Sequence, residues 1–389
     1  MMPKNLTDRV EKITPFYVME LLQRAKQLAA QGRDIIHMEV GEPDFPTPPA
    51  IIKAGIEYLK TGQIKYTPAA GLPELREKIA AFYQARYDIS ISPERILITP
   101  GASGALLVAL SVSLNTDAEI LMADPCYPCN SNIVRLLQGK PRLIPVDAQS
   151  NYQLTAELIA QNWQQQTQAV LIASPSNPTG TIIEPDQLQR CITTVLERDG
   201  VFYSDEIYHG LAYGKNTATA LQYSDQVYVI NSFSKYFGMT GWRVGWLVVP
   251  EYAIETAEKV IQNIFIATAT HSQAAALAAF SEVNLLELEN RRLALEKRRD
   301  FLYHQLLRLG FDIDVKPEGA FYIYANCSKF TDDSFSFARN LLETTGVAIT
   351  PGKDFGDNQV QKFVRFAYTN PIDRLAEAVE RLEKFIQQE

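Results

Sequence analysis

The sequence predicts an α/β protein with a large domain of three αβα layers around a mostly parallel sheet, and a smaller α+β domain. Short apolar runs that lack the polar alternation of half-buried strands alternate with helical segments, which is typical of a parallel sheet covered by helices. At 389 residues the chain is also too long for one simple core. We therefore expect a large domain at residues 49–284 and a small domain made of residues 1–48 and 285–389.

The composition is that of an ordinary soluble globular protein, with 46% hydrophobic and 21% charged residues. A formal net charge of -8 argues against nucleic acid as the main partner. No apolar segment approaches the roughly 20 residues of a membrane helix, and the first residues, MMPKNLTDRV, lack the apolar core of a secretory signal. Since the 4 cysteines are too few for a disulfide scaffold, we expect a cytoplasmic protein.

The amino-terminal region is predicted to be mainly helical. Residues 18–31 carry apolar positions at helical spacing, and Gly32 follows where a helix often ends. A short strand at 34–40 leads into the proline-rich loop GEPDFPTP. Gly41 begins this loop and has no Cβ, so either a ligand approaches its backbone or the loop is a plain interdomain turn. Further helices are expected at residues 49–60 and 72–87.

Buried-type strands then recur along the middle of the chain. Because the connection before the last of them is short, that strand must run antiparallel to its neighbour in the chain or lie elsewhere in the sheet. The expected strands are residues 96–99, 119–123, 169–173, 201–203, 227–230 and 244–249.

Side chains with useful chemistry follow most of these strands, and ligands bind beyond the carboxyl ends of strands in open α/β sheets. After residues 96–99, a glycine-containing turn leads to a helix expected at 105–114, whose free N–H groups suit a phosphate. The sequence of this turn is neither a Walker loop nor GxGxxG. The groups that we expect to converge are Gly101-Ala102-Ser103, Asp124 to Tyr127, Ser174 to Pro178, Asp205 to Tyr208, and Ser232 to Lys235.

Lys235 is the centre of the most reactive stretch, NSFSKYFGMTGWRVGW at residues 231–246. Partial desolvation by its neighbours would lower the pKa of this lysine and make it a nucleophile, and Arg243 suits a phosphorylated anion. A surface lysine after a strand is the alternative, which the convergence of so many groups disfavours. A reactive lysine, a phosphate cradle and a carboxylate are what pyridoxal phosphate requires, because the cofactor forms a Schiff base and needs a protonated ring nitrogen.

The carboxyl-terminal region is expected to form most of the small domain. A long charged helix at residues 285–309, ended by Gly310, is predicted to expose its charges as a solvated face. These charged residues are Arg291, Arg292, Glu296, Lys297, Arg298 and Arg299. After this helix, strands are expected at 319–324 and 364–368, and helices at 335–344 and 372–387.

Several motifs together resemble the class I and II aminotransferases of the fold-type I pyridoxal-phosphate superfamily: SFSKYFGMTGWRVGW, SPSNPTG, DEIY, GEPDFPTP and YTPAAGLPELR. They cover nearly the whole chain in the order of that family. The resemblance implies the fold of pyridoxal-phosphate-dependent transferases, pyridoxal 5'-phosphate as cofactor, transfer of an amino group from an L-amino acid to a 2-oxo acid, and a homodimer.

The resemblance also implies a role for each matching residue. Lys235 would form the Schiff base and carry the substrate proton, Asp205 would pair with the pyridine nitrogen, and Tyr208 and Asn177 would bind the phenolic oxygen. The remaining cofactor contacts would come from Tyr127, which stacks on the ring, and from the phosphate ligands Ala102, Ser103, Ser232, Ser234 and Arg243.

For the substrate, the resemblance implies a bidentate grip of Arg365 on the α-carboxylate, with the Gly41 backbone opposite and Asn177 and Tyr17 nearby. Tyr66 would reach the phosphate of the neighbouring subunit. Structural alternatives are open for four residues: Asp205 as a helix cap, Tyr127 as a core aromatic, Asn177 as a turn former, and Arg365 as an ion-pair partner.

Cys126-Tyr127-Pro128-Cys129 forms a CxxC that a redox or metal site would also contain. Zinc pairs need a second pair or histidines at ligand spacing, and redox pairs occur in a thioredoxin-like context. Neither accompanies this motif, so we expect no metal and no redox role.

A second cation for a dicarboxylic substrate is missing from two places where relatives carry one. The segments 101–104 and 261–271 contain neither lysine nor arginine, which favours a neutral or aromatic amino donor with Phe16, Tyr17 and Phe265 as pocket candidates. Rival functions are an aspartate-type aminotransferase, a C–S β-lyase or a γ-elimination enzyme such as an aminocyclopropane-carboxylate synthase, and a transcription regulator with an aminotransferase-like domain.

Overall fold

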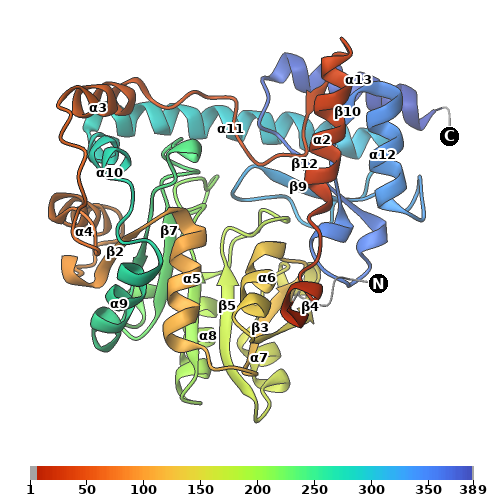
Figure 1. The fold of residues 1–389 in the computed structure, drawn as a ribbon. Coiled ribbons are helices and arrows are strands. Elements are labelled where there is room, and N and C mark those ends of the chain that lie inside the picture. The colour runs from red at the N-terminus through yellow and green to blue at the C-terminus, as the bar shows by residue number, and fades with distance from the viewer. Residues whose placement is uncertain (1–6, 388–389) are drawn as a thin grey trace.

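The computed structural model describes residues 7–387 and contains a central sheet of seven strands in the order β2-β8-β7-β6-β5-β3-β4 (Figure 1). Strands β4, β3, β5, β6 and β7 are parallel, and β8 runs antiparallel to both β7 and β2. The carboxyl end of β2 therefore lies at the same edge as those of the parallel strands. The bounds are β2 Ile96–Thr99, β3 Glu119–Asp124, β4 Lys140–Pro145, β5 Thr167–Ala173, β6 Val201–Asp205, β7 Tyr228–Ser232 and β8 Gly245–Val248.

Apolar side chains from this sheet alternate between two hydrophobic clusters, one on each face. Ile98 and Trp246 belong to one cluster, whereas their strand neighbours Leu97 and Leu247 belong to the other. Helices α4 and α8 cover the first face, and α5 and α9 the second, so the predicted αβα arrangement is confirmed. The helices of this part are α3 Pro49–Lys60, α4 Pro73–Tyr87, α5 Gly101–Ser113, α6 Pro128–Leu136, α7 Ala156–Asn162, α8 Pro185–Leu196, α9 Ile254–Ile264 and α10 Thr270–Ala276.

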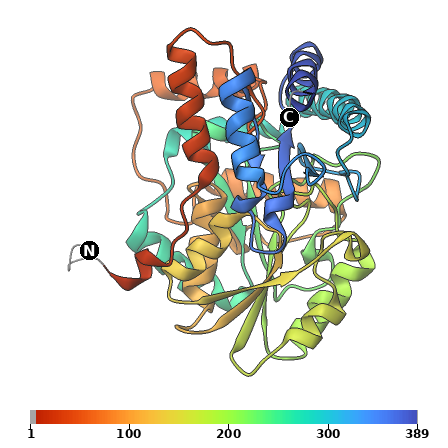
Figure 2. The ribbon, with the colours of Figure 1, turned by 90° about the vertical axis from the view of Figure 1, so that its right-hand side faces the viewer.

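Two smaller sheets join the ends of the chain. Strand β1 (Ile36–His37) pairs in parallel with β10 (Val347–Ala348), while β12 (Phe363–Ala367) lies between β11 (Thr350–Pro351) and β9 (Tyr322–Asn326) in an antiparallel sheet. Figures 1 and 2 show the amino-terminal helix α2, in red, beside the carboxyl-terminal elements, in blue. The remaining α-helices are α1 Asp8–Glu11, α2 Tyr17–Ala30, α11 Glu282–Leu309, α12 Ser334–Thr345 and α13 Ile372–Ile386.

Short 3-10 helices complete the described elements: η1 Pro93–Arg95, η2 Ala148–Ser150, η3 Ala220–Gln222, η4 Thr240–Trp242, η5 Glu251–Ala253, η6 Leu277–Phe280, η7 Gly352–Asp354 and η8 Val360–Lys362. Within residues 7–387, no helix combines the length and apolarity that crossing a bilayer requires. The division into domains at 49–284 and the remainder stays a prediction. Residues 1–6, which belong to the expected small domain and to the stretch without a predicted secretory signal, lie outside the described part.

Two expectations about helices were wrong. The helix expected at residues 105–114 begins at Gly101, so Ala102 and Ser103 form its first turn. The arginines of α11 do not all form a solvated face, because Arg291, Arg298 and Arg299 are buried. Helical periodicity places these arginines on the same stripe as the apolar residues that pack inward, and the inward leucines are Leu288, Leu295 and Leu302.

The buried arginines of α11 hold the proline-rich loop that follows β1. Arg298 forms an ion pair with Asp44 at 2.6 Å, and Arg291 donates a hydrogen bond of 2.6 Å to the Pro46 carbonyl. The ring of Phe45 lies between the two guanidinium groups, with centroid distances of 4.7 Å to Arg298 and 5.3 Å to Arg291. The loop is thus fixed to α11 by ionic, hydrogen-bond and cation–π contacts.

Candidate active site

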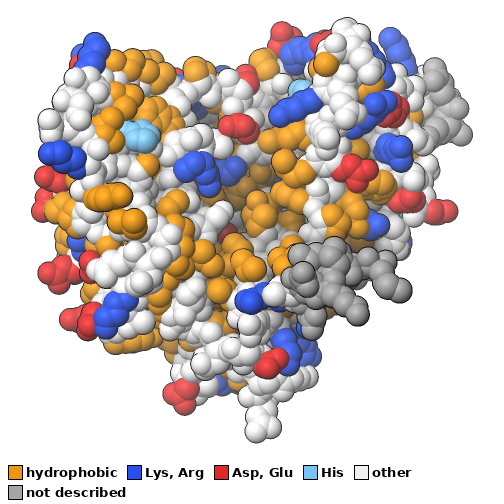
Figure 3. All heavy atoms as spheres, viewed as in Figure 1, with side chains coloured by type: hydrophobic (Ala, Val, Ile, Leu, Met, Phe, Trp, Pro, Cys, Tyr) orange, Lys and Arg blue, Asp and Glu red, His pale blue; other side chains and the backbone are white. Residues whose placement is uncertain are grey.

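A cavity of about 360 Å³ lies at the carboxyl edge of the central sheet, where the small sheets meet it. Figure 3 shows a hollow with mainly hydrophobic walls in the middle of this face of the molecule. The cavity brings together most of the predicted site residues, namely Gly41, Ala102, Ser103, Tyr127, Asn177, Asp205, Tyr208, Ser234, Lys235, Arg243 and Arg365.

Lys235 extends into this cavity from the segment after β7. Its Nζ donates a hydrogen bond of 2.8 Å to the Gly41 carbonyl oxygen and lies 5.6 Å from the ring centroid of Phe321. Burial lowers the pKa of Lys235 to about 8; Glu42 opposes this shift, and Arg365 and Arg243 add to it. About a tenth of the amine is therefore uncharged at pH 7, far more than for an ordinary lysine, and the neutral form is the one that a nucleophile or a proton acceptor requires.

Asp205 is the last residue of β6 and faces the same cavity. Its Oδ1 accepts a hydrogen bond of 3.2 Å from the Ile207 N–H, and burial raises the pKa of its carboxyl to about 6. Burying a carboxylate is costly unless a cation or hydrogen-bond donor meets it. The position therefore suits a ligand that presents a protonated ring nitrogen.

Arg243, Ser234 and the first turn of α5 form a cradle for an anion. The guanidinium Nη1 of Arg243 donates to Ser234 Oγ at 3.4 Å, and helix α5 points its N-terminal N–H groups toward the same place. Gly101 has a positive φ of 72°, and a Cβ on it would lie 2.7 Å from Arg243 Nη2. Backbone amides, a hydroxyl and a guanidinium together fit a phosphate.

Ser232 lies behind this cradle, outside the cavity lining. It is buried, and its Oγ donates to Ser234 Oγ at 3.0 Å. The structure thus places Ser232 where it orients the Ser234 hydroxyl.

Arg365 lies on β12 between two aromatic rings. Its Cζ is 4.2 Å from the ring centroid of Tyr322 and 4.9 Å from that of Phe355. Nη1 donates to Asn177 Oδ1 at 2.8 Å, and Nη2 donates to Thr350 Oγ1 at 3.0 Å, while the buried Nε has no hydrogen-bond partner. A fixed guanidinium with unsatisfied hydrogen-bonding capacity suits a ligand carboxylate.

Tyr127 and Tyr208 enter the cavity from loops after β3 and β6. The ring of Tyr127 packs edge to face against Phe16 with a centroid distance of 6.1 Å. The hydroxyl of Tyr208 lies 3.0 Å from that of Tyr322. Burial raises the pKa of both phenols, so they are neutral hydrogen-bonding groups at ordinary pH.

Besides Ser232, three predicted residues are not brought to this cavity. The ring of Tyr17 packs against Phe335, with 5.5 Å between centroids. Phe16, which precedes α2 in an extended conformation, lines the cavity instead. Phe265 packs against the core on the α5 and α9 side of the sheet. Tyr66 stands on a loop with 81% of its surface exposed.

The sequence interpretation missed Tyr322 and the residues of α2 that roof the cavity. Val18, Met19 and Leu22 lie on one side of α2 and line it; their helical spacing was visible, but it also fits burial in the core. The alternation in GAFYIY indicated a strand without indicating which face meets the site.

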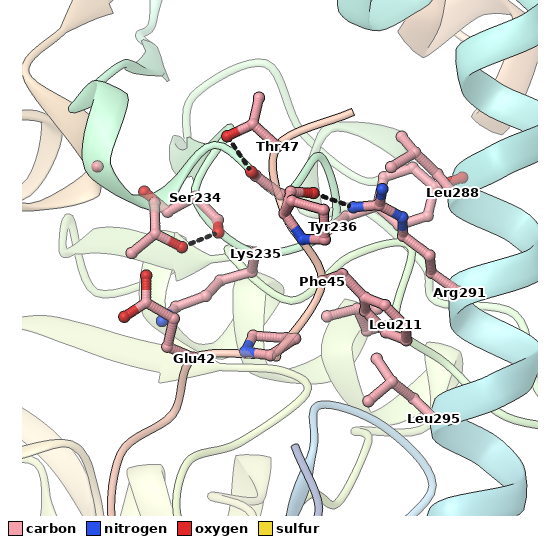
Figure 4. Close-up of a pocket in the computed structure, with 15 residues that line it drawn as sticks. Glu42, Phe45, Thr47, Leu211, Ser234, Lys235, Tyr236, Leu288, Arg291 and Leu295 are labelled. Atoms are coloured by element: carbon pink, nitrogen blue, oxygen red, sulfur yellow. Dashed lines mark hydrogen bonds between the residues drawn. The ribbon is translucent and has the colours of Figure 1, made fainter. Parts of the chain in front are cut away.

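A smaller cavity of about 230 Å³ adjoins Lys235 on its other side (Figure 4). It lies between the loop at residues 42–47 and helix α11, where Thr47 Oγ1 donates to the Gly238 carbonyl at 3.2 Å. Ser234 and Lys235 line both cavities, so they form part of the wall that separates them.

The CxxC motif lies beside the cavity with free thiols on Cys126 and Cys129. Burial raises the pKa of Cys126 to about 12 and also raises that of Cys129. Redox cysteines need an accessible thiolate, so this environment favours no such role. In the part of the chain that the structure describes, no group of three His, Cys, Asp or Glu side chains could hold a metal ion.

Asp354 holds the helix that roofs the cavity. Its two carboxyl oxygens accept hydrogen bonds of 2.7 Å from the N–H groups of Tyr17 and Val18, at the start of α2. Burial raises the pKa of Asp354 to about 6, although both N–H groups and Arg365 lower it. The cap is therefore complete above pH 6 and loses one acceptor as the carboxyl becomes protonated.

We expect the KM for the amino-acid substrate that the sequence resemblance implies to rise about fivefold as the pH falls from 7 to 5, because a lost cap costs ~1 kcal/mol. Asp354→Asn should show a raised KM that stays flat over this range, and a wild-type KM that is flat as well would contradict the prediction.

Protonation of Asp354 affects the stability of the fold in the opposite direction. Since folding raises this pKa, the contribution to stability is full below pH ~4 and is lost as the pH rises through ~6.

The family model described as "Aminotransferase class I and II" matches residues 33–382. The chain is 37% identical to the valine–pyruvate aminotransferase of Mycobacterium tuberculosis, over 98% of this chain and 99% of that protein. It is 34% identical to the aspartate aminotransferase of Bacillus subtilis, over 98% and 99%. The crystal structure of an aminotransferase from M. tuberculosis superposes with a TM-score of 0.95 at 36% identity and covers 100% of both chains.

Proposed function

Because the chain belongs to the class I and II aminotransferases, which move an amino group to a 2-oxo acid with pyridoxal 5'-phosphate, we propose a neutral or aromatic L-amino acid as its amino donor. The observation that carries the proposal is the apolar part of the lining of the cavity that also contains Arg365. It is formed by Phe16, Val18, Met19, Leu22, Leu106 and Ile133.

The charged residues of the cavity lining support the same choice. Its cationic side chains are Lys235, Arg243 and Arg365, and each already has a task in the proposed site. The other charged groups of the lining are carboxylates, namely Glu39, Glu42 and Asp205. A distal carboxylate on the substrate would thus meet apolar or negative groups, which is unfavourable.

The residues of the cavity fit pyridoxal 5'-phosphate, which when bound supplies the electron sink for charge that develops at the substrate Cα. We assign the phosphate to the cradle of Arg243, Ser234 and the α5 amides. Asp205 keeps the proton on the ring nitrogen, since its carboxylate stabilises the positive charge there. Lys235 Nζ would accept the proton from the substrate Cα and donate it to the aldehyde carbon of the cofactor.

Arg365 holds the α-carboxylate of the substrate, and this fixes which Cα bond faces Lys235. Asn177 and Thr350 already orient its guanidinium, so the Arg365 side chain loses little conformational entropy when the substrate binds. Tyr127 covers one face of the ligand, where Phe16 steadies its ring.

The donor is tested by mixing the holoenzyme with single amino acids and following the half-reaction in the visible spectrum. We expect alanine, valine, methionine and the aromatic amino acids to react faster than aspartate. The donor proposal is wrong if aspartate exceeds them more than tenfold in kcat/KM. Release of pyruvate and ammonia from cystathionine, with no oxo acid present, would instead favour a C–S lyase, and a DNA mobility shift would favour a regulator.

A homodimer is part of the proposal, because an apolar surface is left exposed around Tyr66. Ile52, Ile56 and Leu59 form one exposed stripe on α3, and the exposed Ile64 follows on the loop that carries Tyr66. A second copy that covers this surface would bring Tyr66 to the neighbouring phosphate. A cytoplasmic location is proposed too, since the four cysteines are free thiols.

Subunit mixing tests the shared site. Tyr66→Ala and Lys235→Ala should each be impaired alone, whereas a mixed dimer contains one site in which both residues are intact. Co-expression of differently tagged chains should therefore restore activity to about half of the wild-type value per mixed dimer, as one of two sites is complete. Mixed dimers no more active than either parent would exclude the assigned role of Tyr66.

A further inference from the structure

Tyr322, on β9, lies where three parts of the proposed site meet. Its hydroxyl is 3.0 Å from the Tyr208 hydroxyl, and its ring lies 4.2 Å from the Arg365 guanidinium carbon. A Cβ on Gly41 would lie 1.7 Å from the Tyr322 oxygen. The absence of a side chain at Gly41 is therefore what admits this hydroxyl.

The surroundings leave Tyr322 a single orientation. The residue is 2% exposed, and the rings of Phe321 and Tyr208 pack against it with centroid distances of 4.8 Å and 5.9 Å. Its backbone pairs with Ala367 in the register of β9 and β12, the strand that carries Arg365. Ring and hydroxyl are thus fixed relative to both Arg365 and Tyr208.

We propose that Tyr322 is a positioning residue of the transamination site, whose ring orients Arg365 for the substrate carboxylate and whose hydroxyl orients Tyr208 toward the cofactor. The inference rests on the roles proposed for Arg365 and Tyr208. The two contacts use different parts of one side chain, so each can be removed separately.

The ring contact works through geometry and charge. A guanidinium stacked on an aromatic face is attracted to it and keeps its N–H edge free for a planar anion. Phe355 is a second ring against the guanidinium, with a centroid distance of 4.9 Å, so two aromatic side chains contact the group. Loss of the Tyr322 ring leaves the guanidinium free to tilt.

The hydroxyl contact works through the donor strength of Tyr208. When Tyr322 donates to the Tyr208 oxygen, the Tyr208 proton is free for the cofactor's phenolic oxygen, and the hydrogen bonds reinforce each other. Removing the Tyr322 hydroxyl weakens the bond that Tyr208 makes to the ionised phenolic oxygen. The proton in the chromophore is then held more tightly.

Tyr322→Phe in the holoenzyme separates these effects, because it keeps the ring and removes the hydroxyl. The midpoint of the pH-dependent visible spectrum should rise by about 0.2–0.4 pH unit, as expected when the bond from Tyr208 to the phenolic oxygen is weakened but not lost. The KM for the best wild-type donor should change less than twofold. A midpoint shift below 0.1 unit would overturn the assignment of the hydroxyl.

Tyr322→Met keeps similar volume and removes both contacts. KM should rise about tenfold, as for loss of an aromatic–cation contact in a desolvated site, with the same spectral shift as in Tyr322→Phe. An unchanged KM in folded Tyr322→Met would overturn the assignment of the ring; should that variant fail to fold, Tyr322→Leu supplies the same measurement.

Tyr324→Phe is the matched control. Tyr324 is the next residue on the same face of β9, and its ring stacks on Phe363 at 4.6 Å rather than on Arg365. Spectrum and KM should stay at wild-type values. The measurements use whichever donor the wild-type enzyme turns over fastest, so a preference for aspartate would refute the donor proposal without affecting this test.

Discussion

Lys235→Ala is expected to lower kcat by about 10⁴-fold, the upper end of what a positioned acid–base group contributes. The reason is that Lys235 is the lysine in the lining of the proposed site and that burial keeps its amine partly uncharged. The visible band of the holoenzyme should shift in the variant, because its covalent anchor is lost. Steady-state turnover and the spectrum measure both effects.

Lys259→Ala is the control for this loss, since Lys259 is an exposed lysine that pairs with Glu255 on the surface of α9. It should retain wild-type turnover. A Lys235→Ala enzyme that keeps more than a tenth of wild-type kcat would show that another group moves the proton.

The lowered pKa of Lys235 also predicts a pH effect on reconstitution. The rate at which the apoprotein captures the cofactor should rise about tenfold per pH unit up to pH ~8 and then level off, because the neutral amine becomes the dominant form.

Asp205→Asn is expected to lower kcat by about 10²- to 10³-fold, the range for removal of one preorganised electrostatic contact. Asparagine keeps the shape of the side chain but cannot stabilise a protonated ring nitrogen. The cofactor should still bind, since the cradle around Arg243 is unchanged, and cofactor content measured by absorbance separates the two effects.

The control for Asp205→Asn is Asp186→Asn, which changes an exposed aspartate in the first turn of α8. It should leave kcat unaltered. If Asp205→Asn retains kcat within tenfold of wild type while holding its cofactor, the carboxylate has the role of a structural cap through its bond to Ile207.

Most of the central sheet could be predicted because its strands are buried on both faces and therefore consist of continuous apolar runs. Strand β4 was not predicted, since its sequence KPRLIP contains two charges and two prolines. As the edge strand of the sheet it tolerates both, because one side of its backbone needs no partner.

The convergence of Lys235, Asp205 and Arg243 could be predicted from topology alone. Parallel strands deliver their carboxyl ends to one edge, whatever the packing elsewhere. The neighbours of Arg365 could not be inferred in the same way. Tyr322 and Arg365 lie on paired strands of the small sheet outside the central one, and the approach of Tyr322 depends on the missing side chain of Gly41, a contact between residues far apart in the chain.

The directions in which the side chains of α2, α11 and their flanking residues point were the least predictable feature. Phe16 and Tyr17 are adjacent aromatics, yet one faces the cavity and the other Phe335. The arginines of α11 look like surface charges in the sequence, because nothing local shows that the Asp44 carboxylate and the Pro46 carbonyl will meet them.

The contacts of Arg298 and Arg291 that join α11 to the proline-rich loop also affect the position of Lys235's hydrogen-bond acceptor. The Gly41 carbonyl, which accepts the hydrogen bond of Lys235, is only three residues from Asp44, which Arg298 grips at 2.6 Å. A tilt of the 28-residue helix α11 would therefore move the loop and, with it, the Gly41 carbonyl that accepts the hydrogen bond of Lys235. The position of α11 and the hydrogen bond of Lys235 are therefore coupled through this loop.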